Sequence, residues 1–181
     1  QMKANGGLIT KADLAAYEAK ERAPVRGTFN GYEIIAMGPP SSGGTVMLET
    51  LNILEHFGVA KMDRWSPDYL QLRIEAARRA YADRARWLGD PDFVTVPVAR
   101  LTSKAYADTL ARGIKRDRAS KSVDIGSDIL TVRTAESNET THFSVVDAQG
   151  NAVSNTYTLE GGYGSGVVVR GAGFILNNEM G

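Results

Sequence analysis

The sequence contains no cysteine and only two histidines, and each shortage excludes a class of site. Without cysteine the chain can form no disulfide, no thiolate nucleophile and no cysteine-bound metal centre. The two histidines, His56 and His142, cannot build a histidine-rich metal cage within this chain. We expect no metal site in this chain, and no cofactor.

Net charge and long apolar runs are also missing. The 21 basic and 21 acidic side chains cancel, so no overall field attracts nucleic acid or an anionic membrane. No apolar run approaches the ~20 residues of a membrane-spanning helix, and residues 1–7 lack the apolar core of a secretory signal. With 43% hydrophobic and 23% charged residues in 181, the composition predicts a globular protein with a sizeable core. We expect neither a nucleic-acid partner nor a membrane span.

Helical patterns dominate the first two thirds of the chain, and strand patterns dominate the last third. Thr10 and Asp13 form a predicted capping box, and Asn30-Gly31 predicts the turn of a hairpin over residues 28–37. Helices are predicted over about 46–57, 67–88 (through Leu70, Ile74, Ala77, Tyr81 and Ala85) and 102–114, an exposed linker over 119–139, and strands over 142–147, 152–159, 167–169 and 173–176. The pattern predicts a mixed α+β protein.

The most informative stretch begins at Thr140. The pair Thr140-Thr141 follows a polar run and opens an alternating, strand-like segment. If the peptide bond between Glu139 and Thr140 is cut, Thr140 gains a free α-amine beside its hydroxyl, so one residue supplies both nucleophile and base. Most threonine pairs before a strand simply favour β-structure, so other motifs have to support a catalytic interpretation.

Several motifs occur in one order along the chain. They are residues 5–10 (NGGLIT), 39–44 (PPSSGG), 51–55 (LNILE), 81–84 (YADR), 88–93 (LGDPDF), 140–147 (TTHFSVVD), 150–153 (GNAV), 157–159 (YTL), 164–166 (GSG) and 176–180 (LNNEM). Together they resemble the gamma-glutamyltransferase family of N-terminal nucleophile hydrolases, and the resemblance covers nearly the whole chain.

The resemblance implies a fold and a domain division. The family builds an αββα four-layer sandwich and cuts one precursor into a large and a small subunit. Residues 1–139 are then expected to be the C-terminal part of the large subunit, and residues 140–181 the N-terminal part of the small subunit. The sequence is thus expected to be a middle portion of a longer precursor, which the family usually exports to the periplasm or the extracellular space.

The resemblance also assigns roles to individual residues. Thr140 matches the nucleophile, which first attacks the Glu139 carbonyl in autoprocessing, and Thr158 matches the threonine that hydrogen-bonds it. Antiparallel pairing of the two strands offers a physical route to that contact. Glu160 and Glu179 match residues that hold the α-ammonium of the donor. Glu160 is a departure, because many relatives carry asparagine there, and it adds negative charge to the pocket.

Other conspicuous residues are given structural interpretations. His142 is expected to be packed or hydrogen-bonded, His56 to lie at a helix end on the surface, and Ser41 and Ser42 to position backbone. The glycines of residues 161–166 lack the lysine of a phosphate-binding loop. A structural cluster joining helix to loop is expected from Tyr81, Asp83, Arg84, Asp90 and Asp92.

The implied activity is that of a γ-glutamyl hydrolase and transferase. It would cleave the γ-glutamyl amide of glutathione and related donors through a threonine ester, and pass the acyl group to an amino acid, a peptide or water. An acylase acting on glutaryl amides or poly-γ-glutamate stays open, as does an unprocessed module without activity. The family's oxyanion hole and its carboxylate-binding arginine lie outside this chain, so the chain alone is expected to be inactive.

Overall fold

A computed structural model describes residues 1–129 and 140–178 of the chain. The chain divides into two compact units, one formed by residues 20–131 and the other by residues 1–19 together with 132–181. Helices and strands both occur, so the mixed α+β prediction is confirmed at that level. The division expected at residues 139 and 140 concerns a covalent cut rather than a compact unit, and it stays a prediction.

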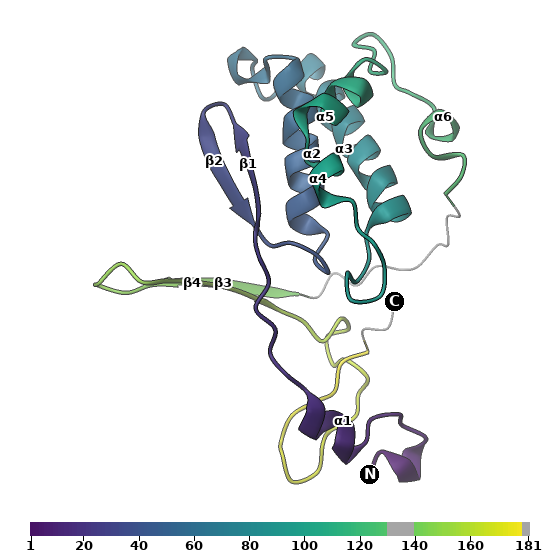
Figure 1. Cartoon of the computed structure of the whole chain (residues 1–181), viewed down its shortest axis with the longest axis vertical. Coiled ribbons are helices and arrows are strands. Elements are labelled where there is room, and N and C mark those ends of the chain that lie inside the picture. Colours follow the sequence, from purple (N-terminus) through teal and green to yellow (C-terminus); the bar gives the residue numbers. More distant parts are fainter. Residues whose placement is uncertain (130–139, 179–181) are drawn as a thin grey trace. The chain divides into compact units, whose positions relative to one another are not determined.

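The larger unit is mainly helical. Its helices are α2 (Gly43–His56), α3 (Pro67–Trp87), α4 (Val98–Leu101), α5 (Lys104–Ala111) and α6 (Ser122–Gly126), with a 3-10 turn at Val59–Lys61. Figure 1 shows α2 and α3 lying side by side with α4 and α5 packed against them. Residues from these helices and the turns beside them form the buried apolar core: Ile53, Leu54, Val59, Leu72, Ala76, Ala107, Ala111 and Ile114.

Local signals in this unit behave as predicted. The strands β1 (Val25–Phe29) and β2 (Tyr32–Ala36) pair in an antiparallel hairpin closed by Asn30-Gly31. Both turn residues have positive φ, 49° and 84°, which is the geometry that an Asn-Gly hairpin turn favours. Ser66 caps α3 by accepting a hydrogen bond from the backbone N–H of Tyr69 at 3.2 Å, and Pro67 occupies the first turn.

Three predictions for the larger unit need correction. The inner face of α3 is formed by Leu72, Ala76 and Ala80, whereas the predicted apolar residues Leu70, Ile74 and Tyr81 are exposed. The helix expected over 102–114 is present but shorter, because Ser103 begins α5 as its N-cap and α5 ends at Ala111. The first part of the expected linker contains α6 and is anchored to α3, since the backbone N–H of Ser120 donates to Glu75 at 3.0 Å.

The smaller unit contains α1 (Lys11–Ala16), a 3-10 turn at Lys3–Asn5 and an antiparallel hairpin of β3 (Thr141–Val146) and β4 (Ala152–Tyr157). Thr10 and Asp13 form the predicted capping box at the start of α1. The strands predicted over 167–169 and 173–176 reduce to a single antiparallel bridge between Val168 and Ile175.

The tip of the β3–β4 hairpin is fixed by one carboxylate. Asp147 accepts hydrogen bonds from the backbone N–H groups of Gln149 and Asn151, both at 2.9 Å, and from the Asn151 amide at 2.7 Å. Gly150 has a φ of 84°, a conformation that glycine adopts without steric cost. This tip sets the register in which Val146 faces Ala152 and Thr141 faces Tyr157.

None of the helices within residues 1–129 and 140–178 is both long enough and apolar enough to cross a lipid bilayer.

Candidate active site

Two threonine hydroxyls meet at the open end of the β3–β4 hairpin. Thr140 immediately precedes β3 and Thr158 immediately follows β4, one step beyond the pair Thr141 and Tyr157. The Thr140 hydroxyl donates a hydrogen bond to Oγ1 of Thr158 at 3.2 Å. The placement predicted from antiparallel pairing is therefore confirmed, while the catalytic roles of the two residues stay predictions.

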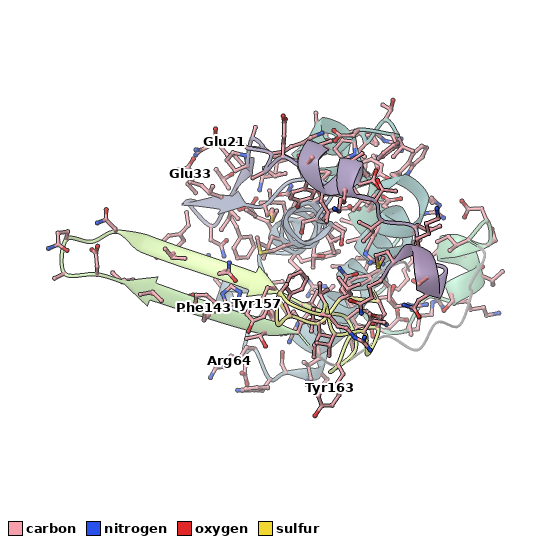
Figure 2. The ribbon with its side chains drawn as sticks, turned by 90° about the horizontal axis from the view of Figure 1, so that it is seen from below. Glu21, Glu33, Arg64, Phe143, Tyr157 and Tyr163 are labelled. Carbon is pink, nitrogen blue, oxygen red and sulfur yellow. The ribbon has the colours of Figure 1, made fainter. Side chains whose placement is uncertain are left out.

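The hairpin has one polar and one largely apolar face. His142 shares the face of Thr140, where its Nδ1 is 2.6 Å from Oγ1 of Thr156 and its Nε2 lies 3.2 Å from Oγ of Ser154. On the other face the rings of Phe143 and Tyr157 meet edge to face with centroids 6.5 Å apart (Figure 2). His142 is hydrogen-bonded as predicted, although its side chain is exposed rather than packed.

A hollow of about 420 Å³ opens beside the threonine pair. It is lined by Thr140, Thr141, Tyr157, Thr158, Leu159, Gly161 and Gly162. The two glycines contribute backbone without side-chain bulk, so a small ligand can approach the hydroxyls closely. Both hydroxyls are thus accessible from one cavity within this unit.

Glu160 has an unusual backbone conformation. Its φ is 69°, in the left-handed region that residues other than glycine, asparagine and aspartate seldom adopt. In this conformation its backbone N–H donates to Oγ1 of Thr158 at 2.8 Å. The Glu160 carboxylate in turn accepts a hydrogen bond from the side-chain amide of Asn178. Glu160 therefore acts on the threonine pair through its main chain, a role that its side-chain type does not reveal.

Asn178 is a residue of the site that sequence reasoning missed. Its Oδ1 accepts from the backbone N–H of Gly161 at 2.9 Å, and its own backbone N–H donates to the Leu159 carbonyl at 3.2 Å. With the bond to Glu160, one asparagine holds three consecutive residues after Thr158. The sequence offered one signal for this residue: Asn178 lies in the motif of residues 176–180, directly before the predicted site residue Glu179.

The glycine-rich loop returns toward the same segment. The backbone N–H of Ser165 donates to the Leu176 carbonyl at 2.9 Å. Gly164 has a φ of 51°, and a Cβ at this position would overlap the Leu176 carbonyl oxygen. This close approach requires glycine, so the loop serves backbone packing.

Thr140, Thr158 and Glu160 are brought together among the predicted site residues. Glu139 and Glu179 lie outside the described residues. In the parts of the chain that the structure describes, no group of three or more acidic, histidine or cysteine side chains is arranged to hold a metal ion.

The expected cluster is confirmed only in part: the Arg84 guanidinium lies over the Tyr81 ring, and the Asp92 backbone N–H donates to Asp90 at 2.9 Å, but Asp83 binds Tyr106 and Arg86. Other partners hold the remaining groups. Arg84 donates to Ser42 at 3.0 Å, and Asp92 pairs with Lys20 at 2.7 Å and with Arg22 at 2.9 Å. Ser42 is thereby tied to α3, in line with a structural role. His56 ends α2 on the surface as predicted, with Nδ1 2.9 Å from Asp108.

Asp83 belongs instead to a buried acidic pair that the sequence did not predict. Glu49 and Asp83 are 1% and 2% exposed, and they lie next to each other. Burial, followed by the charge of Asp83, raises the pKa of Glu49 to about 9. Asp83 also accepts from the Tyr106 hydroxyl at 2.6 Å and from Arg86 at 3.2 Å. With its pKa this high, the Glu49 carboxyl is protonated and uncharged at neutral pH.

Comparison with known proteins places these features in context. A family model described as "Gamma-glutamyltranspeptidase" matches residues 1–181. A glutathione hydrolase proenzyme of Escherichia coli K12 is 51% identical over 180 residues, covering 99% of this chain and 31% of the relative. An acylase ACY 1 proenzyme of Pseudomonas sp. SE83 is 47% identical over 179 residues, with coverages of 99% and 31%. The chain thus spans about a third of the length of these curated relatives.

A solved structure supports the same similarity. The gamma-glutamyltranspeptidase of Helicobacter pylori matches with a TM-score of 0.66 and 46% identity. The match covers 68% of this chain and 36% of the other.

Proposed function

Because this chain belongs to the gamma-glutamyltranspeptidase family, we propose that the whole protein is a γ-glutamyl hydrolase and transferase that acts on glutathione and related γ-glutamyl compounds. The single observation that carries the proposal is the 3.2 Å contact between the Thr140 and Thr158 hydroxyls beside an open hollow. A nucleophilic hydroxyl needs a fixed orientation and room for the substrate carbonyl, and both are present at this point.

Maturation is proposed to begin at the bond between Glu139 and Thr140. Oγ1 of Thr140 attacks the Glu139 carbonyl carbon, the C–N bond breaks as the hydroxyl proton passes to the Thr140 nitrogen, and an ester to Thr140 replaces the amide. Water then hydrolyses the ester, which leaves a Glu139 carboxylate and a Thr140 with both a free α-amine and a free hydroxyl. Residues 1–139 and 140–181 would then belong to different subunits of an αββα sandwich.

Turnover is proposed to reuse the same hydroxyl. The α-amine of Thr140 takes the hydroxyl proton while Oγ1 attacks the γ-carbonyl carbon of the donor. The amide C–N bond breaks, the leaving amine takes the proton, and a γ-glutamyl ester remains on Thr140. Water, an amino acid or a peptide then attacks the ester and releases the hydroxyl.

Binding of the donor is proposed to involve the two glutamates. Glu160 and Glu179 would hold the α-ammonium of the donor by charge-assisted hydrogen bonds. Support comes from the neighbouring residue Leu159, which lines the hollow. The whole protein is further proposed to work in the periplasm or outside the cell.

The acylase relative and Glu160 favour a second candidate function. The Pseudomonas acylase proenzyme is 47% identical to this chain, and a carboxylate at position 160 changes the charge that a donor meets. Hydrolysis of glutaryl amides or poly-γ-glutamate is the corresponding activity. Rates on a γ-glutamyl anilide and a glutaryl anilide separate the two, because only the first offers an α-ammonium.

The proposal is tested in the full-length protein with Thr140→Ala and Thr140→Ser. Intact mass should show two chains for the natural sequence, with threonine at the N-terminus of the smaller one. Thr140→Ala should remain one chain and lose turnover of γ-glutamyl anilide, whereas Thr140→Ser should retain cleavage because it keeps a hydroxyl. Turnover by an uncut protein, or by Thr140→Ala, would refute the proposal.

A further inference from the structure

Asn178 occupies a position that the proposed chemistry does not yet explain. It makes its three hydrogen bonds to three consecutive residues, Leu159, Glu160 and Gly161. The middle one of these is held in the left-handed conformation, with φ at 69°. A residue other than glycine keeps such a backbone conformation only where the surroundings stabilise it. The contacts of Asn178 supply that stabilisation from both sides of the strained residue.

The strained conformation has a direct effect on the threonine pair. It aims the Glu160 backbone N–H at Oγ1 of Thr158, 2.8 Å away. The same oxygen accepts the hydroxyl of Thr140 at 3.2 Å. Because Oγ1 of Thr158 already accepts the Glu160 N–H, its orientation toward Thr140 depends on where residue 160 is held.

We propose that Asn178 is a positioning residue, which holds Glu160 in its left-handed conformation and thereby orients Thr158 against the nucleophile. This inference rests on the proposed function of Thr140 and deepens it. Asn178 touches neither hydroxyl, so it acts through the main chain of Glu160. The Glu160 carboxylate is consequently an anchor for the loop as well as a candidate ligand of the donor.

An exchange of donor and acceptor tests the contact in the full-length enzyme. Asn178→Asp keeps an acceptor for the Gly161 N–H but places a second carboxylate next to that of Glu160. The two negative charges repel each other, so the hydrogen bond between residues 178 and 160 is lost. The double variant Glu160→Gln with Asn178→Asp restores one amide and one carboxylate in exchanged positions. Asn155→Asp is the matched control, because it adds the same charge on β4 at a residue paired with Phe143.

Steady-state kinetics on γ-glutamyl anilide give the readout. Asn178→Asp should lower kcat by about 10-fold to 100-fold, since a misplaced catalytic group costs rate. The double variant should return to the kcat of Glu160→Gln alone, and Asn155→Asp should match the natural enzyme. KM should change mainly in Glu160→Gln. A change in kcat therefore reports the positioning of the threonine pair, and a change in KM reports binding of the donor.

Other outcomes overturn the inference. If Asn178→Asp keeps the natural kcat, or if the double variant stays as slow as Asn178→Asp, Asn178 does not position the pair. If Asn178→Asp does not accumulate in folded form, Asn178→Ser takes its place, because it removes the amide donor without adding charge. An unchanged kcat in Asn178→Ser would also contradict the positioning role. If Thr140→Ala is inactive while Asn178→Asp is unaffected, only the positioning role fails. Activity in Thr140→Ala removes the proposed function itself.

Discussion

The buried pair of Glu49 and Asp83 predicts that the helical unit loses stability as the pH rises. In the folded chain the pKa of Glu49 is about 9, whereas its ordinary value is 4.5. Between these two values the folded form holds a proton that the unfolded form has released. Stability contributed by this proton is therefore complete below pH 4.5 and is lost as the pH rises through about 9.

The substitution Glu49→Gln isolates this effect. Glutamine has nearly the same shape and keeps an N–H donor for Asp83, but it does not titrate. A single proton bound only in the folded state gives a slope of about 1.4 kcal/mol per pH unit. Between pH 6 and pH 8, the stability of the glutamine variant relative to the natural protein should therefore increase by up to about 3 kcal/mol.

Hydrogen exchange of α2 peptides in the full-length protein measures this difference locally. Comparing both proteins at the same pH removes the intrinsic pH dependence of exchange, so the ratio of exchange rates reports the difference in opening free energy. The groups that act on Glu49 include Asp83 from α3, Arg100 from α4 and Tyr106 from α5, and Arg86 of α3 binds Asp83. Burial and the hydrogen bond to Asp83 raise the pKa of Tyr106 to about 12, so its hydroxyl keeps its proton over this pH range.

Glu55→Gln in the same helix is the matched control. Hydrogen bonds from Lys104 and from the Asn30 backbone lower the pKa of Glu55, so it does not titrate between pH 6 and 8. Its effect on protection should be independent of pH in that range. If the difference in opening free energy between the natural protein and Glu49→Gln also stays constant from pH 6 to 8, the protonation of Glu49 is refuted.

Two further predictions concern single substitutions in the full-length protein. For Glu75, burial would raise the pKa, but hydrogen bonds from Ser120 and Arg79 outweigh it and lower the pKa to about 2; the stability it contributes is present above pH 4.5 and lost as the pH falls toward 2. Ser120→Ala should therefore shift acid unfolding to higher pH, as followed by circular dichroism, and an unshifted midpoint would contradict this. Gly164→Ala should destabilise the smaller unit by about 1–3 kcal/mol, because the residue has positive φ and abuts the Leu176 carbonyl. Faster exchange of the 160–178 segment would show this, and unchanged exchange would argue against it.

Features specified by a few neighbouring residues could be predicted from the sequence. The capping box of Thr10 and the Asn30-Gly31 turn satisfy backbone groups locally, so no distant contact is needed to form them. The meeting of Thr140 with Thr158 followed from strand pairing, which a hairpin with a short tip makes nearly local.

Features that depend on long-range polar pairing could not be predicted. The inner face of α3 includes Glu75, Arg79 and Asp83, which are buried because each has a polar partner in the folded chain. A search for apolar periodicity instead selects the exposed residues Ile74 and Tyr81. Asn178 was missed for a similar reason, since its contacts form only when the chain folds back onto residues 159–161.

The hydrogen bonds that Asp147 accepts at the tip of the β3–β4 hairpin have a consequence for how this hairpin can change in evolution. Side chains of a strand alternate between faces, so a shift of one residue in pairing would turn Thr158 away from Thr140. The far tip thus helps to keep Thr140 and Thr158 on the same face of the hairpin. An insertion or deletion at the tip that shifted this pairing by one residue would separate the two hydroxyls without altering either threonine.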